Sequence, residues 1–238
     1  MIKIFDVLPS TNDYVKANFG ALKNLDCVAA RSQTAGKGRS GKSFSSPQGG
    51  LYFTVYFDNP SPALFSYMTA LAAIAMRRVI ARHTKKKVTV KWVNDVFIET
   101  KKVCGILAES VLSNNALRVA LGIGVNLFTP RGGFDKSIET SACALDDETV
   151  TAEKFLTETL KELLGLFDEF EKNYAILESL RSEYEENSFL LEKTVTVTSG
   201  NKVYCGKVTG INDKFNLLLD IDGQITAVYS GSVTNIKD

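Results

Sequence analysis

The clearest pattern in the chain is a long apolar stretch that ends in basic residues. Residues 63–83 are apolar on most faces at first, and the last turn is basic, where cations stabilise a helix. Residues 151–173 and 175–186 predict two amphipathic helices. A shorter helix begins near Ser10, because the serine and threonine there can cap it. His83, the single histidine, falls at the end of the long helix and is expected to be a helix-end residue.

The middle of the chain alternates apolar and polar residues with the period of two that strands show. Residues 88–92, 94–99, 102–110 and 116–126 form this meander, with turns predicted at Thr100–Lys101 and 113–115. Strands that follow one another on short turns pair antiparallel. Because the helices lie outside this region, the pattern predicts an α+β fold.

The alternation resumes near residue 190 and continues to the C-terminus. It runs around the turn sequences SGN, IND and DG and predicts about four or five short strands. Strands this short and close together form a small barrel. We therefore expect two domains, 1–187 and 188–238, with the barrel in the second.

The stretch GKGRSGKS, residues 36–43, matches the G-x-x-x-x-G-K-[ST] signature of a P-loop. A P-loop needs a strand before it and a helix after it, because its amides and the helix dipole together hold the phosphates. Pro47 and the pair Gly49–Gly50 lie where that helix would run, and residues 51–57 read as a strand. The stretch is therefore predicted not to be a P-loop.

The same stretch is nevertheless cationic. No acidic residue occurs between residues 27 and 57, whereas Arg31, Lys37, Arg39 and Lys42 do. The whole chain carries 28 basic and 27 acidic residues, so this positive charge is local. The glycines let backbone amides approach an anion. Taken alone, the pattern fits either a phosphate-binding loop or a solvated surface loop.

Composition narrows the classes of function. With 238 residues and 45% hydrophobic content, the chain is long enough for one substantial domain, or for one domain plus a small module. The N-terminus lacks the features of a signal peptide and no apolar run reaches the roughly 18 residues of a membrane helix, so a cytoplasmic protein is expected. Four scattered cysteines argue against a zinc site and for reduced thiols. The net charge of +1 argues against duplex DNA binding.

Four stretches together resemble the biotin–protein ligases. They are STND at residues 10–13, the glycine-rich stretch at 33–54, KWVNDVFIETKKVCGILAE at 91–109 and GIGVN at 122–126, in the order and spacing of that family. The resemblance implies a class II synthetase-like core, a mostly antiparallel mixed sheet backed by helices, followed by a small SH3-like barrel. It also implies the ligase-only class, because STND begins too early for an N-terminal DNA-binding domain.

The resemblance implies a two-step reaction. Biotin and ATP, with Mg²⁺, give biotinyl-5′-AMP and pyrophosphate, and one lysine of a biotin carboxyl carrier domain then takes the biotinyl group. Two anions must meet in the first step, so positive charge has to be held at the junction. No DNA or membrane partner and no resident metal site are expected. The resemblance also implies that a homodimer can form through the edge of the core sheet, as in other members of the family.

Each proposed site residue is carried over from a matching motif. Ser10, Thr11 and Gln33 match positions that bind the ureido ring, although a serine and threonine here also suit helix capping. Arg39 matches the residue that holds the adenylate phosphate, and Lys102 the one that binds carboxylate and phosphate oxygens. Asp95 is expected to orient the incoming lysine amine. The remaining expected binding residues are Asn12, Gly36, Lys37, Gly38, Phe44, Gly105, Gly122, Gly124 and Asn126.

The chain departs from the family pattern at a few positions. Lys37 replaces an arginine and Phe44 replaces a tryptophan that packs over adenine. A lipoate ligase or an octanoyltransferase of the same fold is the nearest alternative, and a non-catalytic biotin sensor is another. Octanoyl transfer needs a nucleophilic cysteine, and Cys104 is expected on the same strand face as Lys102 because strand faces alternate. An ordinary apolar strand position is the other interpretation of Cys104.

Overall fold

A computed structural model describes residues 1–113 and 115–237. Its larger part is a seven-stranded sheet with the order β1-β2-β3-β7-β6-β5-β4. Among the described strand pairs of this sheet, β1 and β2 alone run parallel, which confirms the mostly antiparallel mixed sheet. The strands are β1 (Ile2–Leu8), β2 (Cys27–Gln33), β3 (Leu51–Asp58), β4 (Val88–Lys91), β5 (Asp95–Ile98), β6 (Lys101–Ser113) and β7 (Ala116–Val125).

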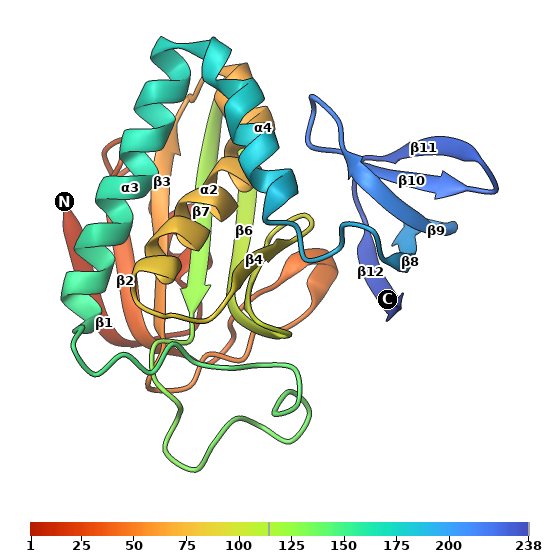
Figure 1. Cartoon of the computed structure of the whole chain (residues 1–238). Coiled ribbons are helices and arrows are strands. Elements are labelled where there is room, and N and C mark those ends of the chain that lie inside the picture. The colour runs from red at the N-terminus through yellow and green to blue at the C-terminus, as the bar shows by residue number, and fades with distance from the viewer. Residues whose placement is uncertain (114, 238) are drawn as a thin grey trace.

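Helices cover both faces of this sheet. Figure 1 shows α2 (Pro62–Arg82), α3 (Ala152–Lys172) and α4 (Leu177–Glu186) together on the face turned to the viewer. A short helix, α1 (Thr11–Ala17), packs on the other face, where Val15 and Phe19 meet Val28 and Tyr56 in a separate apolar cluster. The alternation of strand side chains therefore divides the core into two layers.

The long helix α2 is the centre of the larger layer. Ser61 caps it and Pro62 occupies its first turn, where a missing amide hydrogen costs nothing. Within the described residues α2 is also the one helix long and apolar enough to cross a membrane, by length and composition only. Its apolar residues pack between the sheet, α3 and α4, so packing accounts for its hydropathy.

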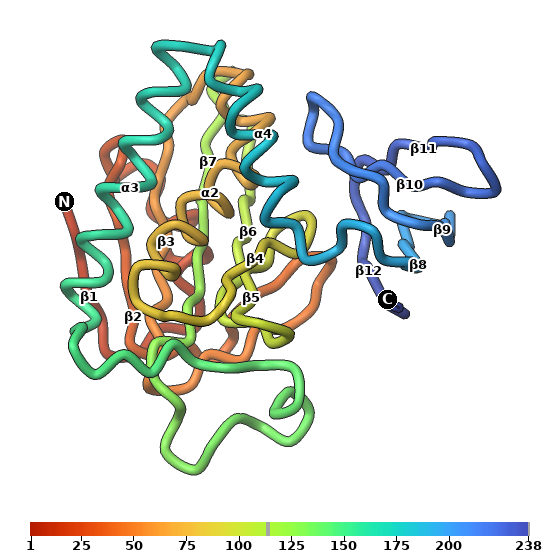
Figure 2. Tube along the Cα trace, viewed as in Figure 1, coloured from red at the N-terminus to blue at the C-terminus, as the bar shows by residue number. Residues whose placement is uncertain are grey.

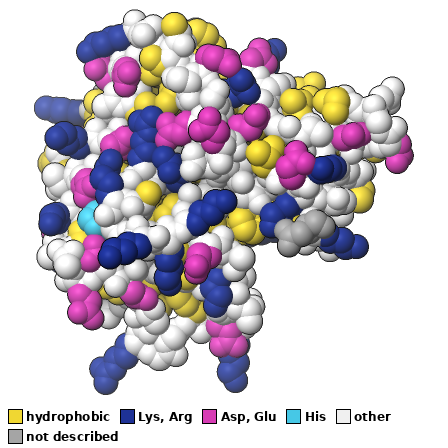
Figure 3. Space-filling view, in the orientation of Figure 1, with side chains coloured by type: hydrophobic (Ala, Val, Ile, Leu, Met, Phe, Trp, Pro, Cys, Tyr) yellow, Lys and Arg dark blue, Asp and Glu magenta, His cyan; other side chains and the backbone are white. Residues whose placement is uncertain are grey.

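Ion pairs join the outer surfaces of the three helices. Arg78 of α2 binds Glu162 of α3 and Glu183 of α4 at 3.2 and 2.6 Å. His83, which follows the last residue of α2, lies 2.8 Å from Asp147 and 2.9 Å from Glu158, as expected of a helix-end residue. Figure 3 shows basic and acidic side chains interspersed over the helical face.

A five-stranded antiparallel sheet forms the C-terminal part, with the order β11-β10-β9-β8-β12. Figures 1 and 2 show it beside the end of α4, away from β1. Its inward residues continue the larger core layer, and the Trp92 indole donates to Phe215 O at 2.9 Å. The strands are β8 (Thr194–Ser199), β9 (Lys202–Ile211), β10 (Leu217–Ile221), β11 (Gln224–Val228) and β12 (Ser232–Lys237).

Element boundaries differ slightly from the predicted ones. The hairpin turn before β6 lies at Glu99 and Thr100, one residue earlier than predicted, because Lys101 already pairs with Ile98. The second amphipathic helix is preceded by a 3₁₀ turn, Tyr174–Ile176. The turn predicted at 113–115 includes residue 114, which lies outside the described residues.

Candidate functional site

A cavity of about 240 Å³ lies against strands β5, β6 and β7 of the core sheet, and residues 231–233 of the C-terminal region also line it. The segment after Ser43 forms no helix before β3, which confirms that residues 36–43 are not a P-loop. Instead this loop lies over the cavity and lends it several side chains. The predicted site residues that line the cavity are Ser10, Thr11, Asn12, Gln33, Lys37, Gly38, Arg39, Phe44, Asp95, Lys102, Gly105, Gly122 and Gly124.

One end of the cavity presents uncharged polar groups. The Ser10 hydroxyl accepts a hydrogen bond from Asp13 N, so it caps α1 as predicted. Next to it, the Thr11 amide and hydroxyl donate to Gln33 Oε1 at 2.8 and 3.2 Å, and Gln33 Nε2 donates to Ser46 Oγ at 2.9 Å. Two segments more than twenty residues apart therefore meet here with fixed side chains.

Asn12 is buried behind this polar end. Its Nδ2 donates to Glu109 Oε2 at 2.8 Å, and its Oδ1 accepts from the Thr54 hydroxyl at 2.6 Å. Gly122 faces it on β7, and a Cβ atom at that position would overlap Asn12 Oδ1. In this structure Gly122 therefore makes room for Asn12; it also lines the cavity, so its part in ligand binding stays a prediction.

The opposite end of the cavity is cationic. Lys102 Nζ forms an ion pair with Asp95 Oδ1 at 2.7 Å and lies 5.2 Å from the centroid of the Phe44 ring. Lys37 also lines the cavity, but it lies toward the other end, where it pairs with Asp13 of α1 at 2.8 Å. The two predicted catalytic residues Lys102 and Asp95 are thus in direct contact.

Arg39 reaches across the cavity from the glycine-rich loop. Its Nη1 donates to Asn94 Oδ1 at 2.8 Å and its Nη2 to Gly231 O at 3.1 Å. Asn94 in turn donates to Ile106 O at 2.8 Å, so its orientation is fixed. Burial lowers the pKa of the Arg39 guanidinium, because it disfavours the charged form, and the nearby Asp95 carboxylate opposes that effect.

Two glycines form the floor on which Phe44 lies. Gly105 of β6 and Gly124 of β7 are direct partners across the two strands. A Cβ atom would come within 2.8 Å of Phe44 Cε2 at Gly105 and within 2.6 Å of Phe44 Cε1 at Gly124. The glycine pair therefore leaves room for the Phe44 ring to lie against the sheet. The family pattern has a tryptophan at this position.

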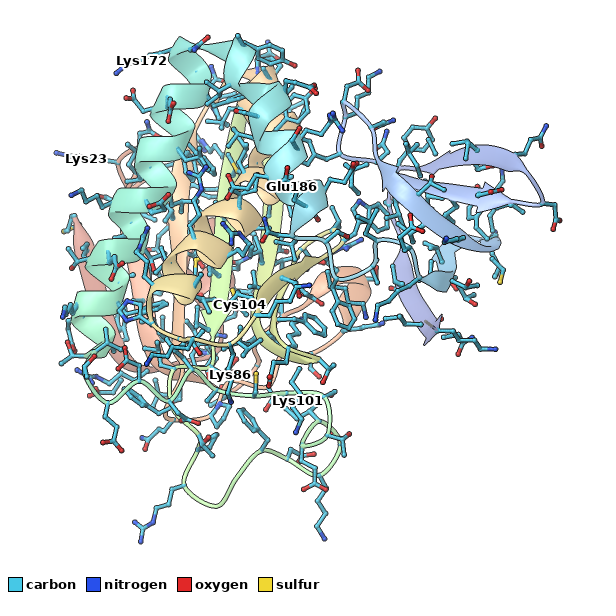
Figure 4. The ribbon with its side chains drawn as sticks, viewed as in Figure 1. Lys23, Lys86, Lys101, Cys104, Lys172 and Glu186 are labelled. Atoms are coloured by element: carbon cyan, nitrogen blue, oxygen red, sulfur yellow. The ribbon has the colours of Figure 1, made fainter. Side chains whose placement is uncertain are left out.

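Cys104 does not share the face of Lys102, so this prediction was wrong. Val96 pairs with Cys104 and Phe97 pairs with Lys102, so Val103 is an extra residue in β6 and the strand bulges there. The bulge directs Lys102 to the cavity and Cys104 into the core, where it is fully buried. Figure 4 labels Cys104 in the middle of the larger part of the molecule. Burial raises the pKa of the Cys104 thiol, which makes it a poor nucleophile.

Two predicted binding residues lie outside the cavity lining. Gly36 is buried beside it, where a Cβ atom would overlap Phe44 O and Ser46 Oγ. Asn126 donates from Nδ2 to Cys143 O at 3.0 Å, and its side chain is buried. Both residues shape the segments around the cavity: Gly36 the loop that bears Phe44, and Asn126 the segment around residue 143.

The structure adds residues that sequence reasoning did not place in the site. Asn94, which positions Arg39, was known only as part of the K-W-x-N-D motif, and Lys91 of the same motif also lines the cavity. The segment 231–233 of the C-terminal sheet was not anticipated, because no local pattern marks it. Among the described residues no group of three or more His, Cys, Asp or Glu side chains is placed to hold a metal ion.

The sequence profile of the biotin/lipoate A/B protein ligase family matches residues 4–126, and that of the biotin protein ligase C-terminal domain matches residues 190–234. The chain belongs to the biotin/lipoate A/B protein ligase family. Within this family it is 28% identical to the bifunctional ligase/repressor BirA of Escherichia coli, over 98% of this chain and 73% of that protein. The biotin–[acetyl-CoA-carboxylase] ligase of Paracoccus denitrificans is 35% identical over 54% of this chain and 57% of its own length.

Solved structures of other proteins match the fold of this chain over nearly its whole length. The biotin protein ligase from Aquifex aeolicus in complex with biotin and ATP superposes with a TM-score of 0.82 and 25% identity, over 98% of this chain and 97% of that one. The similarity includes both sheets. The α+β core and the small C-terminal β region are therefore the fold of this family.

Proposed function

We propose that the protein is an ATP-dependent biotin–protein ligase. It would activate biotin as biotinyl-5′-AMP and transfer the biotinyl group to one lysine of a biotin carboxyl carrier domain. The observation that carries the proposal is a single cavity that joins an uncharged polar end, at Thr11 and Gln33, to a cationic end at Arg39 and Lys102. Biotin has two ends that complement these: a neutral ureido ring and an anionic carboxylate.

The uncharged end suits a ring that both donates and accepts hydrogen bonds. Ser10, Thr11 and Gln33 offer hydroxyl and amide groups whose positions are fixed by hydrogen bonds. Thr11 donates to Gln33, Gln33 donates to Ser46 and Ser10 accepts from Asp13 N. Asn12 supports them from behind through Glu109 and Thr54. A preorganised polar end selects the cofactor by its ring, and the carboxylate then points toward the cations.

The cationic end suits adenylation. In that step a carboxylate oxygen of biotin bonds to the α-phosphorus of ATP, and the bond from that phosphorus to the oxygen bridging to the β-phosphate breaks. Arg39 and Lys102 place positive charge where two anions must approach each other. Phe44, on the floor made by Gly105 and Gly124, offers a ring for stacking with adenine.

The ion pair of Lys102 and Asp95 suits the second step. The amine of a carrier lysine attacks the acyl carbon of the adenylate, AMP leaves, and the nitrogen that formed the new bond loses a proton. Asp95 is the carboxylate nearest to Lys102 and can orient the amine and accept that proton. Mg²⁺ would enter with ATP as part of that substrate, because Asp95 is the one carboxylate among the described residues that line the cavity.

Further proposals concern the setting of the enzyme. The ligase core is residues 1–187 and the SH3-like domain residues 188–238; the partner is a carboxylase carrier domain, as the name of the Paracoccus relative suggests. The enzyme is cytoplasmic, contacts neither DNA nor membrane, and forms a homodimer through its core sheet.

ATP–pyrophosphate exchange with biotin, lipoate or octanoate tests the proposal. Exchange with biotin alone, lost in Lys102→Ala, is the expected result, and Lys101→Ala is the matched control because Lys101 neighbours Lys102 but does not line the cavity. Exchange with lipoate would assign the chain to the lipoate branch of the same family. No exchange with any acid would refute ligase activity and favour a transferase or a biotin sensor.

A further inference from the structure

The cavity carries far more positive than negative charge. Among the described residues that line it, one is a carboxylate, Asp95, and the cations are Lys37, Arg39, Lys42, Lys91 and Lys102. Two of the cations have carboxylate partners: Lys37 pairs with Asp13 and Lys102 with Asp95. Arg39 and Lys91, in contrast, donate to neutral oxygen atoms.

Lys91 is the less expected of these two cations. It is the last residue of β4, and its Nζ donates to Val233 O at 3.4 Å, close to the limit for a hydrogen bond. The Nζ also lies 5.6 Å from the centroid of the Phe97 ring. Burial lowers the pKa of this ammonium, with smaller opposing and reinforcing effects from Asp95, Lys102 and Lys42, the charged groups that face it.

A half-buried ammonium held by one long hydrogen bond is costly to the fold, because it has given up part of its hydration without gaining an ion pair. Such groups gather at sites that bind an opposite charge. Within the part of the chain that the structure describes, the Lys91 ammonium donates to the carbonyl of Val233 and pairs with no carboxylate. Its position on the cavity wall is therefore best explained by an anion that it binds.

The pairing register of the sheet shows where Lys91 lies relative to Lys102 and Asp95. Gly124, Gly105, Asp95 and Lys91 are successive partners across β7, β6, β5 and β4, and all four line the cavity. Neighbouring strands are about 4.8 Å apart. The uncharged end of the cavity lies toward β2, so Lys91 lies beyond Lys102 and Asp95, at the opposite limit of the row.

Resting on the proposed function, we propose that Lys91 binds the pyrophosphate that leaves ATP during adenylation. The biotin carboxylate would approach from the β2 side, so an in-line displacement at the α-phosphorus expels the leaving group toward β4. The electron pair of the broken P–O bond stays on pyrophosphate, and the ammonium of Lys91 stabilises that added charge without giving up its proton. Lys91 is thus a catalytic residue of the first step alone.

Three variants separate this role from a structural one. Lys91→Met keeps the length of the side chain and removes its charge, and Lys91→Arg keeps the charge. Lys101→Met is the matched control, because Lys101 is also a strand lysine that donates to a backbone carbonyl at 3.4 Å but does not line the cavity. Each protein is titrated with inorganic pyrophosphate by calorimetry, and its thermal unfolding is recorded.

Lys91→Met is expected to weaken pyrophosphate binding by about ten- to hundredfold, the loss of one charge-assisted hydrogen bond. It should slow biotin-dependent ATP–pyrophosphate exchange and leave transfer from preformed biotinyl-5′-AMP to a carrier domain unchanged. Lys91→Arg should retain binding, and Lys101→Met should match the parent protein.

Wild-type affinity for pyrophosphate in Lys91→Met would overturn the inference, and so would an equal loss in both half-reactions, which indicates a structural role. Failure of the parent protein to exchange with any acid would refute the proposed function instead. The calorimetric titration distinguishes the two, since it needs neither biotin nor catalysis.

Discussion

Gly122→Ala tests whether the fit between α1 and β7 shapes the cavity. The new Cβ would overlap Asn12 Oδ1 and come within 2.8 Å of Asn12 Cγ and 3.0 Å of Asn12 Nδ2. Asn12 is only 4% exposed and is tied to Glu109 and Thr54, so it has little freedom to move aside. The methyl group therefore either compresses the packing or displaces the Asn12 side chain.

Each route has a similar cost. Overpacking of a filled interior costs about 1–3 kcal/mol. Displacing Asn12 leaves the fully buried Thr54 hydroxyl with one partner fewer and costs about 1–3 kcal/mol as well. For a chain of this size that loss lowers Tm by about 2–12 °C. The same displacement disturbs neighbouring Thr11, so biotin affinity should fall by about tenfold or more.

Thermal unfolding and calorimetric titration with biotin measure the two effects. Gly165→Ala is the control, because Gly165 lies in α3 with no atom near its missing side chain and should gain about 0.5–1 kcal/mol. The decisive comparison is Gly122→Ala in an Asn12→Ala background, where the overlap is removed and the stability cost should largely disappear. An equal cost in both backgrounds, or no cost at all, would refute the steric reasoning.

Three further predictions concern other parts of the chain. Arg39→Gly removes the donor held by Asn94 and should let biotinyl-5′-AMP escape and label bystander lysines; undiminished retention of the adenylate would count against the role of Arg39. Hydrogen bonds from Thr149, and then from His83, lower the pKa of Asp147 from 3.8 to about 2, so its stabilising contribution is present above pH 3.8 and is lost as pH falls toward 2. Asp147→Asn should therefore weaken the pH dependence of the midpoint of urea unfolding over that range. A pH dependence equal to that of the parent protein would contradict this. Cys104→Ala should retain adenylation and transfer, since Cys104 faces the core, and loss of acyl transfer alone would restore the octanoyltransferase alternative.

Local sequence patterns predicted those parts of the site whose cause is local. The cap at Ser10 follows from the preference of helix starts for short hydroxyl side chains, and the structure shows that hydrogen bond. The rejection of a P-loop followed from Pro47 and Gly49–Gly50, which rule out a helix over the same few residues. In both cases the deciding interactions lie within about a turn of the residue concerned.

Features that depend on distant partners left no readable signal. The bulge at Val103 turned Cys104 away from Lys102, and a period-two argument has no means of locating an extra residue in a strand. Gly122 makes room for Asn12, more than a hundred positions earlier, and no local pattern indicates that contact. The contact of Arg39 with Gly231 spans 192 positions and depends on how the two sheets pack.

The partners of the cations divide the cavity into two kinds of positive charge. To bind phosphate, Lys102 must weaken its 2.7 Å ion pair with Asp95, whereas Arg39 and Lys91 exchange only neutral carbonyl and amide oxygens for a charged one. Hydrogen bonds to charged acceptors are roughly twice as strong as those to neutral acceptors. Arg39 and Lys91 therefore gain by exchanging their present acceptors for phosphate, without first losing an ion pair. Because two of these neutral acceptors, Gly231 O and Val233 O, belong to the C-terminal region, that region holds both cations at the cavity without neutralising them.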